Sequence, residues 1–190
     1  GVRFVEPGEG YLACGWIGKG RLPEPDEIVN AAEQALRPSG SLVGRSVVVT
    51  AGPTYEDLDP VRFLGNRSSG RMGFAVAAEA ITRGARVVLV AGPTTLSPPA
   101  GAEVVRVRSA DEMHAAVMTR AANADAVVMA AAVADYTPAG GDQPDKIQKA
   151  DADLTVTLRR TPDILAALGR ERGARPLPVL VGFAAETSEL

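Results

Sequence analysis

The sequence contains very few of the residues that build disulfides and transition-metal sites. Cys14 is the single cysteine and His114 the single histidine in 190 residues. One cysteine excludes an internal disulfide, which agrees with a reducing compartment. The same scarcity excludes metal clusters built on cysteine and histidine, so any metal here would be a hard cation held by oxygen.

Long apolar runs and an excess of positive charge are also missing. No run approaches the roughly 18 to 20 apolar residues that span a bilayer, and the opening residues GVRFVEPGEG lack the basic and apolar regions of a leader. We therefore expect a cytoplasmic protein that does not bind a membrane. The formal net charge of −3 gives no general attraction for nucleic acid, so any polyanion site must be local.

From about Arg45 onward, apolar strand patterns alternate with helical patterns. The expected strands are residues 45–50, 85–92, 103–107, 124–133, 154–160 and 178–186, and the expected helices are residues 71–84, 109–121 and 161–173. This alternation predicts an α/β fold, with a Rossmann-like, doubly wound, mostly parallel sheet in three α/β/α layers. Ligands of such sheets bind beyond the carboxyl ends of the strands, so the polar loops after Thr50, Val133 and Gly182 should meet there.

Residues 1–44 have a different character. They contain Gly-rich turns, Pro23 and Pro25, a short helical pattern at residues 26–36 and a linker-like stretch, RPSGSL. We expect an appendage over residues 1–44 and one full domain over residues 45–190.

The most informative stretch is the loop that enters the first expected helix, GNRSSGRMG at residues 65–73. Free N–H groups and the helix dipole favour an anion at such a helix start. Glycines allow close approach, serines add donors and arginines supply charge; these residues are Arg62, Gly65, Arg67, Ser68, Ser69, Gly70, Arg71 and Gly73. The alternative is a structural Gly/Ser turn with solvated arginines, because the stretch is neither a Walker A loop nor a GxGxxG fingerprint.

A second group of residues follows the strand expected at residues 124–133. The small residues Ala130 to Ala132 at the end of this strand leave room for a flat ring. Asp135 would accept hydrogen bonds from an amino group or help to hold a cation. Lys146 and Lys149 would neutralise phosphates as point charges. The alternatives are core packing for the small residues and a solvated face for the lysines.

A third group lies at the start of the last expected helix and at the end of the last strand. Thr161 reads as the N-cap with Pro162 at the first helical position, and a simple cap is the alternative to any binding role. Phe183 is either a core residue or a wall for a base. His114 lies in an amphipathic helical pattern without a partner, and we interpret it as a surface residue.

Together these motifs resemble one family in order and spacing. TAGPTYEDLDPVRFLGNRSSGRMG, MAAAVADYTP, KIQK, TPDIL and VGFAAE are similar to successive signatures of bacterial phosphopantothenate–cysteine ligase, over roughly residues 40–190. The resemblance implies an enzyme that joins L-cysteine to 4'-phosphopantothenate with CTP and Mg²⁺, through an acyl-cytidylate, in coenzyme A biosynthesis. It also implies a homodimer, small-molecule substrates and no nucleic-acid partner.

The resemblance carries roles onto individual residues by position. The implied CTP-binding residues are Met129, Ala130, Ala131, Asp135, Lys146, Lys149, Pro162, Asp163, Ile164, Leu165 and Phe183. The implied loop for phosphopantothenate and phosphate comprises Gly52, Gly65, Asn66, Ser68, Ser69, Gly70 and Arg71. Catalytic roles fall on Asn66, Arg62 and Lys146, and Mg²⁺ would be held through the nucleotide phosphates, with no protein ligands identified.

The leading segment resembles a different enzyme. ACGWIGKGR at residues 13–21 is similar to the end of the flavin-dependent phosphopantothenoylcysteine decarboxylase, which is commonly fused ahead of the ligase. The resemblance makes Cys14 a flap proton donor that is not functional here, because the rest of the FMN-binding domain is missing. The ligase family continues beyond VGFAAETSEL, so we also expect the ligase domain to be truncated.

Two other functions remain open on the residues alone. A nicotinamide-dependent short-chain reductase would have a similar sheet, although no glycine fingerprint follows Thr50 and no Tyr-x-x-x-Lys begins at Tyr136. A nucleotide-binding module without turnover is the third possibility.

Overall fold

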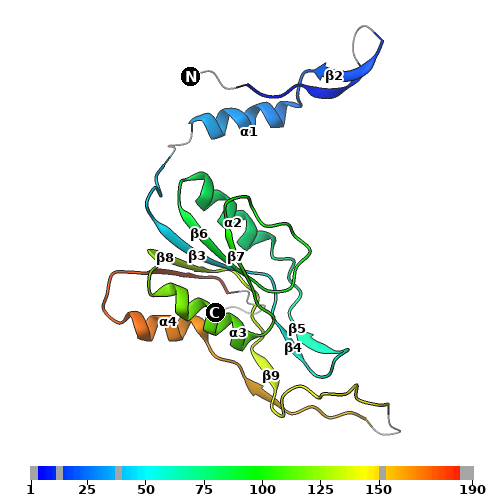
Figure 1. Cartoon of the computed structure of the whole chain (residues 1–190), viewed down its shortest axis with the longest axis vertical. Helices are drawn as coiled ribbons and strands as arrows, with labels where there is room; N and C mark the ends of the chain where they lie inside the picture. Colours follow the sequence, from blue (N-terminus) through cyan, green and yellow to red (C-terminus); the bar gives the residue numbers. More distant parts are fainter. Residues whose placement is uncertain (1–3, 12–14, 37–39, 150–152, 185–190) are drawn as a thin grey trace. The chain divides into compact units, whose positions relative to one another are not determined.

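The computed structural model describes residues 4–11, 15–36, 40–149 and 153–184. The chain forms two units, residues 1–39 and residues 40–190. In the first unit, β1 (Gly8–Tyr11) and β2 (Ile17–Arg21) form an antiparallel hairpin, and α1 (Pro25–Leu36) follows (Figure 1). The helix was predicted and the hairpin was not. Cys14 lies outside the described residues.

The second unit is built on a five-stranded parallel sheet. Its strands are β3 (Ser46–Ala51), β6 (Arg86–Ala91), β7 (Glu103–Arg106), β8 (Ala126–Met129) and β11 (Val179–Gly182). Their order across the sheet is β11-β8-β3-β6-β7, and every neighbouring pair is parallel. The chain moves from β3 to one side and then returns to the other side at β8, which creates a topological switch point between these two strands.

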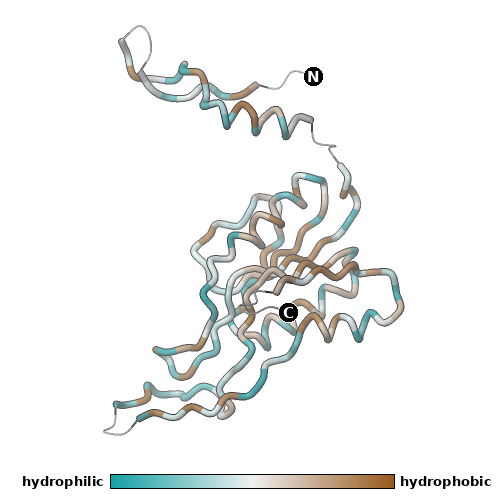
Figure 2. Tube along the Cα trace, turned by 180° about the vertical axis from the view of Figure 1, so that it is seen from behind, coloured by the Kyte–Doolittle hydropathy of each residue, from teal (hydrophilic) through white to brown (hydrophobic). Residues whose placement is uncertain are grey.

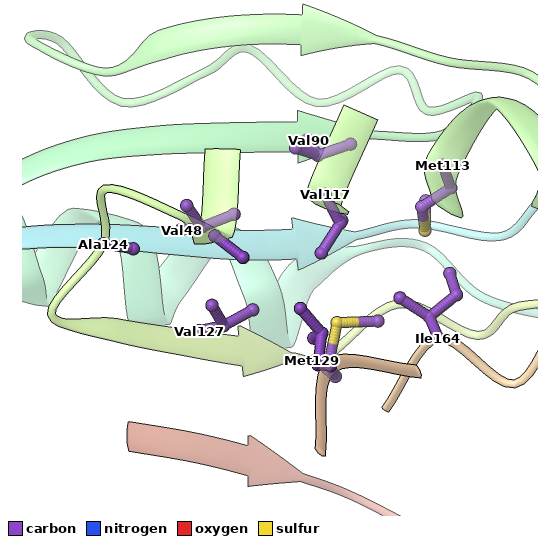
Figure 3. Close-up of a cluster of buried hydrophobic side chains, with 10 residues drawn as sticks. Val48, Val90, Met113, Val117, Ala124, Val127, Met129 and Ile164 are labelled. Carbon is purple, nitrogen blue, oxygen red and sulfur yellow. The ribbon is translucent and has the colours of Figure 1, made fainter. Parts of the chain in front are cut away.

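Helices cover both faces of the sheet, because alternate strand residues point to opposite faces. On one face, Val47 and Val49 pack with Phe74 and Ala77 of α2 (Arg71–Thr82). On the other face, Val48 packs in a cluster with residues of α3 (Ala110–Ala121) and α4 (Ile164–Arg172). Figure 3 shows Met113 and Val117 of α3 over the valines of the central strands. The predicted three-layer α/β/α fold is confirmed.

The hydrophobic residues concentrate where the sheet was expected. Figure 2 shows hydrophobic colour along the central strands, and mixed colour in the segments at the carboxyl end of the sheet. None of the helices within the described ranges is long and apolar enough to cross a membrane.

The structure places the boundary between the two units earlier than predicted, between Ser39 and Gly40. The Leu42 amide donates to the Arg83 carbonyl at 2.9 Å, and the Leu42 side chain packs on the α2 side of the core. Residues 40–44, which were predicted to belong to the appendage, are therefore part of the second unit.

Three predicted strands are shorter in the structure. The strand predicted over 178–186 ends at Gly182, and residues 183 and 184 lie in no strand. The strand predicted over 124–133 ends at Met129, because the following backbone bonds to the Thr50 side chain and to groups that come after β3. The strand predicted over 154–160 is reduced to β10 (Leu158–Arg160), which pairs antiparallel with β9 (Tyr136–Pro138) outside the main sheet.

The loop between residues 53 and 70 contains an unpredicted hairpin. β4 (Tyr55–Asp57) pairs antiparallel with β5 (Phe63–Gly65), and the Tyr55 and Phe63 rings stack with their centroids 3.8 Å apart. Two aromatic residues on either side of an Asp-Pro turn were the available sequence signal.

The helix starts were predicted with mixed success. Ser109, the first residue of the helix predicted over 109–121, caps α3, and its hydroxyl accepts from the Glu112 amide at 3.1 Å. The predicted cap Thr161 was wrong, because α4 begins at Ile164 and its cap is Asp163, whose carboxylate accepts from the Ala166 amide at 2.9 Å.

Candidate active site

A cavity of about 1180 Å³ lies beyond the carboxyl ends of β8 and β11, at the starts of α2 and α4. Ligand pockets commonly measure about 300 to 1,000 Å³, so this one has room for a large ligand. Four chain segments line it: residues 66–72, 129–136, 160–165 and 182–184. The cavity lies beside the switch point between β3 and β8, where ligands of doubly wound sheets bind.

The start of α2 contributes an anion-binding surface to the cavity. Gly70 has a left-handed backbone with φ 80° and supplies no side-chain cap, while the Ser68 and Ser69 hydroxyls accept from the amides of Gly70 at 3.3 Å and Arg71 at 3.5 Å. Gly70, Arg71 and Met72 all line the cavity. The positive end of the helix dipole and the guanidinium of Arg71 are therefore available to a negatively charged group.

The glycines of the predicted phosphate loop also serve close packing. A Cβ at Gly73 would lie 2.5 Å from the Ala51 Cβ and 2.6 Å from the Thr50 carbonyl oxygen, so only glycine lets α2 approach β3 this closely. A Cβ at Gly65 would lie 2.9 Å from the Thr54 carbonyl oxygen. Gly52 and Gly65 are not among the residues that line the cavity.

Buried threonine hydroxyls shape the second wall, residues 129–136. The Thr50 hydroxyl accepts from the Ala131 amide at 3.0 Å, and the Thr54 hydroxyl accepts from the Ala134 amide at 2.9 Å. Between them, the Ala132 amide donates to the Gly52 carbonyl at 2.9 Å. These bonds replace a regular strand ladder and hold the small residues of this wall at the cavity.

Asn66 and Thr161 join this wall to its neighbours. The Asn66 side-chain amide donates to the Val133 carbonyl at 2.9 Å. The Thr161 hydroxyl donates to the Ala134 carbonyl at 2.6 Å, and the Thr161 amide donates to the Asp135 carbonyl at 3.0 Å. Three motifs far apart in the sequence are thus connected by hydrogen bonds at one site.

The remaining walls come from the start of α4 and the end of β11. Pro162, Asp163, Ile164, Leu165 and Phe183 all line the cavity. Phe183 is 55% exposed, so the core alternative for this residue is wrong and its ring is available to a ligand. A Cβ at Gly182 would lie 2.5 Å from the Leu165 Cδ2, so the two walls touch.

Three basic residues predicted for the site lie outside the cavity wall. Arg62, Lys146 and Lys149 are not among the residues that line the cavity. One guanidinium nitrogen of Arg62, Nη1, donates to the Asp59 carboxylate at 2.8 Å and to the Ile147 carbonyl at 3.1 Å. Arg62 therefore contacts the chain segment that carries both lysines.

Sequence reasoning missed several cavity residues. Met72, Tyr136 and Arg160 line the cavity, and Thr161 does so as a wall residue that does not cap the helix. Tyr136 and Arg160 are paired across β9 and β10. A basic residue directly before the TPDIL motif was the available signal for Arg160.

The described residues offer no ready-made metal centre. No group of three or more histidine, cysteine, aspartate and glutamate side chains that could hold a metal occurs among them. Asp135 presents one exposed carboxylate at the cavity. This donor set fits an ion such as Mg²⁺ that takes most of its ligands from substrate phosphates and water.

Comparison with known proteins identifies the family. Residues 42–190 match the family described as the DNA/pantothenate metabolism flavoprotein C-terminal domain. The chain belongs to this family. Its matched range agrees with the range over which the motifs resemble phosphopantothenate–cysteine ligase.

Members of the family are close relatives of this chain. It is 49% identical over 193 residues to the coenzyme A biosynthesis bifunctional protein CoaBC of Bacillus subtilis (strain 168), a match that covers 100% of this chain and 47% of that protein. It is 47% identical over 198 residues to CoaBC of Mycobacterium tuberculosis (strain ATCC 25618 / H37Rv), with the same two coverages. The chain therefore spans about half the length of these curated relatives.

A solved structure supports the same assignment. The crystal structure of the C-terminal domain of a CoaBC protein is 44% identical and superposes with a TM-score of 0.67, covering 79% of this chain and 69% of that one. These relatives belong to coenzyme A biosynthesis, and the nicotinamide-dependent reductase alternative receives no support from them.

Proposed function

We propose that the chain carries the phosphopantothenate–cysteine ligase site, which joins L-cysteine to 4'-phosphopantothenate at the expense of CTP. One observation carries this proposal. A single cavity brings together Asn66 and the start of α2, the segment after β8, the start of α4 and Phe183. These are the segments to which the family resemblance assigns CTP and phosphopantothenate.

The chemistry requires an activated carboxylate, because a carboxylate alone is a poor acceptor for an amine. A carboxylate oxygen of phosphopantothenate attacks the α-phosphorus of CTP, and the bond to pyrophosphate breaks. The cysteine ammonium loses a proton, and its nitrogen then attacks the acyl carbon of the acyl-cytidylate. The bond to CMP breaks, and the nitrogen loses a second proton as the amide forms.

The cavity walls suit these reactants. The small residues Ala130 and Ala131 and the exposed Phe183 ring would enclose the cytosine base. Pro162 to Leu165 would complete the nucleoside pocket, and Asp135 would accept from an amino group or bind the cation. The preference for CTP over ATP rests on the family resemblance.

Both substrates are anions, so the site must offset their repulsion. Two unit charges ~4 Å apart repel by about 4 kcal/mol at an effective dielectric constant of about 20. Positive charge at the cavity comes from the start of α2, Arg71 and Arg160. Lys146 and Lys149, which lie outside the cavity wall, would add further positive charge. Mg²⁺, carried by the nucleotide phosphates, would supply the remaining electrostatic stabilisation.

Asn66 has a separate role in the proposal. Its side-chain amide lies at the cavity and already donates to the Val133 carbonyl. We expect it to donate to the acyl or phosphate oxygen as charge moves there. Asn66→Ala should therefore spare CTP binding and impair turnover, and an equal loss of both would contradict this role.

The wider setting follows from the resemblance. We place the enzyme in the cytoplasm as a homodimer that acts on small molecules. We assign residues 1–39 to the end of a decarboxylase domain, whose FMN chemistry would belong to parts of the longer relatives that this chain does not match.

Isothermal titration of the purified chain with CTP and with ATP, both with Mg²⁺, is the first test. We expect CTP to bind and ATP to bind much more weakly. Binding of neither nucleotide would contradict a cytidine site in this chain.

Mass spectrometry tests turnover. With 4'-phosphopantothenate, cysteine and CTP, we expect 4'-phosphopantothenoylcysteine, CMP and pyrophosphate. CTP binding without any product would leave the nucleotide-binding module as the correct function for this chain.

A further inference from the structure

Asp59 is a buried carboxylate with an unusually complete set of donors. The residue is 1% exposed. Its Oδ1 accepts from the amides of Val61 and Arg62, both at 2.8 Å. Its Oδ2 accepts from the Arg62 guanidinium at 2.8 Å and from the Ile147 amide at 3.1 Å. Asp59 therefore links its own turn to a segment more than eighty residues away in the sequence.

That segment, residues 141–149, has little else to hold it. It contains no helix or strand, and Ile147 is its one half-buried residue among eight exposed ones. The Gln143 amide donates to the Leu58 carbonyl at 3.0 Å. At Ile147, the amide reaches Asp59 and the carbonyl accepts from Arg62 at 3.1 Å. Both backbone polar groups of Ile147 are thus satisfied by one ion pair.

The carboxylate is ionised in this setting. Burial raises the pKa of Asp59. This rise is outweighed by hydrogen bonds from the amides of Val61, Ile147 and Arg62 and by the Arg62 charge, so the pKa lies below its ordinary value. Hydrogen bonds to an ionised acceptor are stronger than those between neutral groups. The link between Asp59 and Ile147 is therefore well suited to fix an exposed segment.

We propose that Asp59 is a positioning residue, which with Arg62 holds Ile147 and so presents Lys146 and Lys149 to the phosphates of the nucleotide. This inference rests on the proposed function. It assigns Arg62 a task in holding the lysine segment, which differs from the catalytic role that the resemblance implies. It also explains why Arg62, to which the family resemblance assigns a role in the site, lies outside the cavity wall.

Asp59→Asn tests the link itself. Asparagine keeps the shape but replaces one acceptor oxygen with an NH₂ group, which would face donors from Arg62 and Ile147. We expect trypsin to cleave the native variant after Lys146 and Lys149 about tenfold faster than the wild type, because the segment opens more often. Peptide mass spectrometry would locate the cleavage.

Asp57→Asn is the matched control. Asp57 lies two residues away and accepts from the Arg108 side chain at 2.6 Å through both oxygens, without a bond to residues 141–149. Its cleavage rate after the two lysines should stay within about twofold of the wild type. Equal acceleration in both variants would overturn the proposal, since it would show general loosening of the hairpin.

The functional part is tested by comparing CTP with CMP. Asp59→Asn should weaken CTP binding about tenfold and leave CMP binding within about twofold, because only the triphosphate extends to the lysines. Equal weakening of both nucleotides, or of neither, would overturn the positioning role. A wild-type chain that fails to bind CTP would instead contradict the proposed function, while the cleavage rates still decide whether Asp59 holds the segment.

Arg62→Ala provides a second variant if Asp59→Asn does not fold. The Arg62 side chain is 41% exposed, so its removal leaves no large cavity, yet it deletes the donor to the Ile147 carbonyl. The same faster cleavage after Lys146 and Lys149 is expected. An unchanged rate in this variant would contradict a role for the ion pair in holding the segment.

Discussion

The cavity wall after β8 and the lysine segment at residues 141–149 are fixed in different ways. The wall is bonded through its backbone to Thr50, Gly52 and Thr54, which lie in or just after β3, a strand buried from Val47 to Ala51. The lysine segment is exposed and is bonded at Ile147 to a single ion pair. The wall is therefore part of the folded core, whereas the segment depends on one side-chain link.

This difference suits the two tasks that we propose for them. A base pocket requires a rigid wall, because its shape decides which ring fits. Lysines that neutralise phosphates work as point charges and tolerate movement. Four experiments test whether the wall and the lysine segment differ in this way.

Gly73→Ala should give the largest loss of stability. The new Cβ would meet the Ala51 Cβ and the Thr50 carbonyl oxygen at 2.5 and 2.6 Å, so α2 must move away from β3. We expect a loss of about 2 to 3 kcal/mol in the free energy of unfolding, measured by urea denaturation. Gly169→Ala is the control, because its Cβ meets nothing within 4 Å and alanine favours a helix by about 0.5 to 1 kcal/mol. Losses of similar size in both variants would contradict the close-packing argument.

Thr54→Val should also weaken the wall. It removes the hydroxyl that accepts from the buried Ala134 amide at 2.9 Å. A buried donor without a partner costs about 1 to 3 kcal/mol, which urea denaturation would measure. Thr54→Ser keeps the hydroxyl and should retain most of the stability. If serine and valine cost the same, the hydroxyl is not what holds the wall.

Arg160→Ala should change binding while stability stays nearly constant. Arg160 lies at the cavity, and we expect about a tenfold weaker CTP affinity by titration, with the free energy of unfolding changed by less than about 0.5 kcal/mol. Arg159→Ala is the control, since Arg159 donates to Asp111 at 3.3 Å and both side chains are exposed. Such pairs contribute little. Equal weakening of CTP binding in both variants would point to a general charge effect.

Acid should release the lysine segment only below the usual pKa of an aspartate. Because the pKa of Asp59 is lowered in the folded state, its link to Ile147 stays intact above the unfolded value, about 3.9, and is lost as the pH falls through the lower folded value. The NMR shift of the Ile147 amide should therefore titrate with a midpoint below about pH 3.9. A midpoint above that value would show that Asp59 is not stabilised as an anion.

The sheet was predictable because it depends on local pattern. Buried parallel strands appear as short β-branched runs, and α2 and α3 were predicted from their helical patterns. The predicted ends of strands are wrong where a hydrogen bond to a residue distant in the sequence ends the strand. The strand after Ala124 stops at Met129 because Thr50 accepts the Ala131 amide, and the sequence around Met129 does not show this.

The candidate site was predictable in its parts and not in its arrangement. Small residues, a basic loop and a capped helix were visible as motifs, and most of them line the cavity. Asp59 was missed, although an aspartate before Pro60 is a typical turn residue whose carboxylate bonds to the next amides. Its bond to Ile147 had no local signal.

By itself, the sequence determined the alternation of strands and helices, the family and the chemical types of residue available for binding. Periodicity and motifs encode these properties within short segments of chain. Only the tertiary structure decided which motifs share a cavity, as when Asn66 donates to Val133 across 67 residues, and that Arg62 contacts the lysine segment outside the cavity wall. The physical reason is that such contacts depend on where strand ends meet in space, which no local pattern specifies.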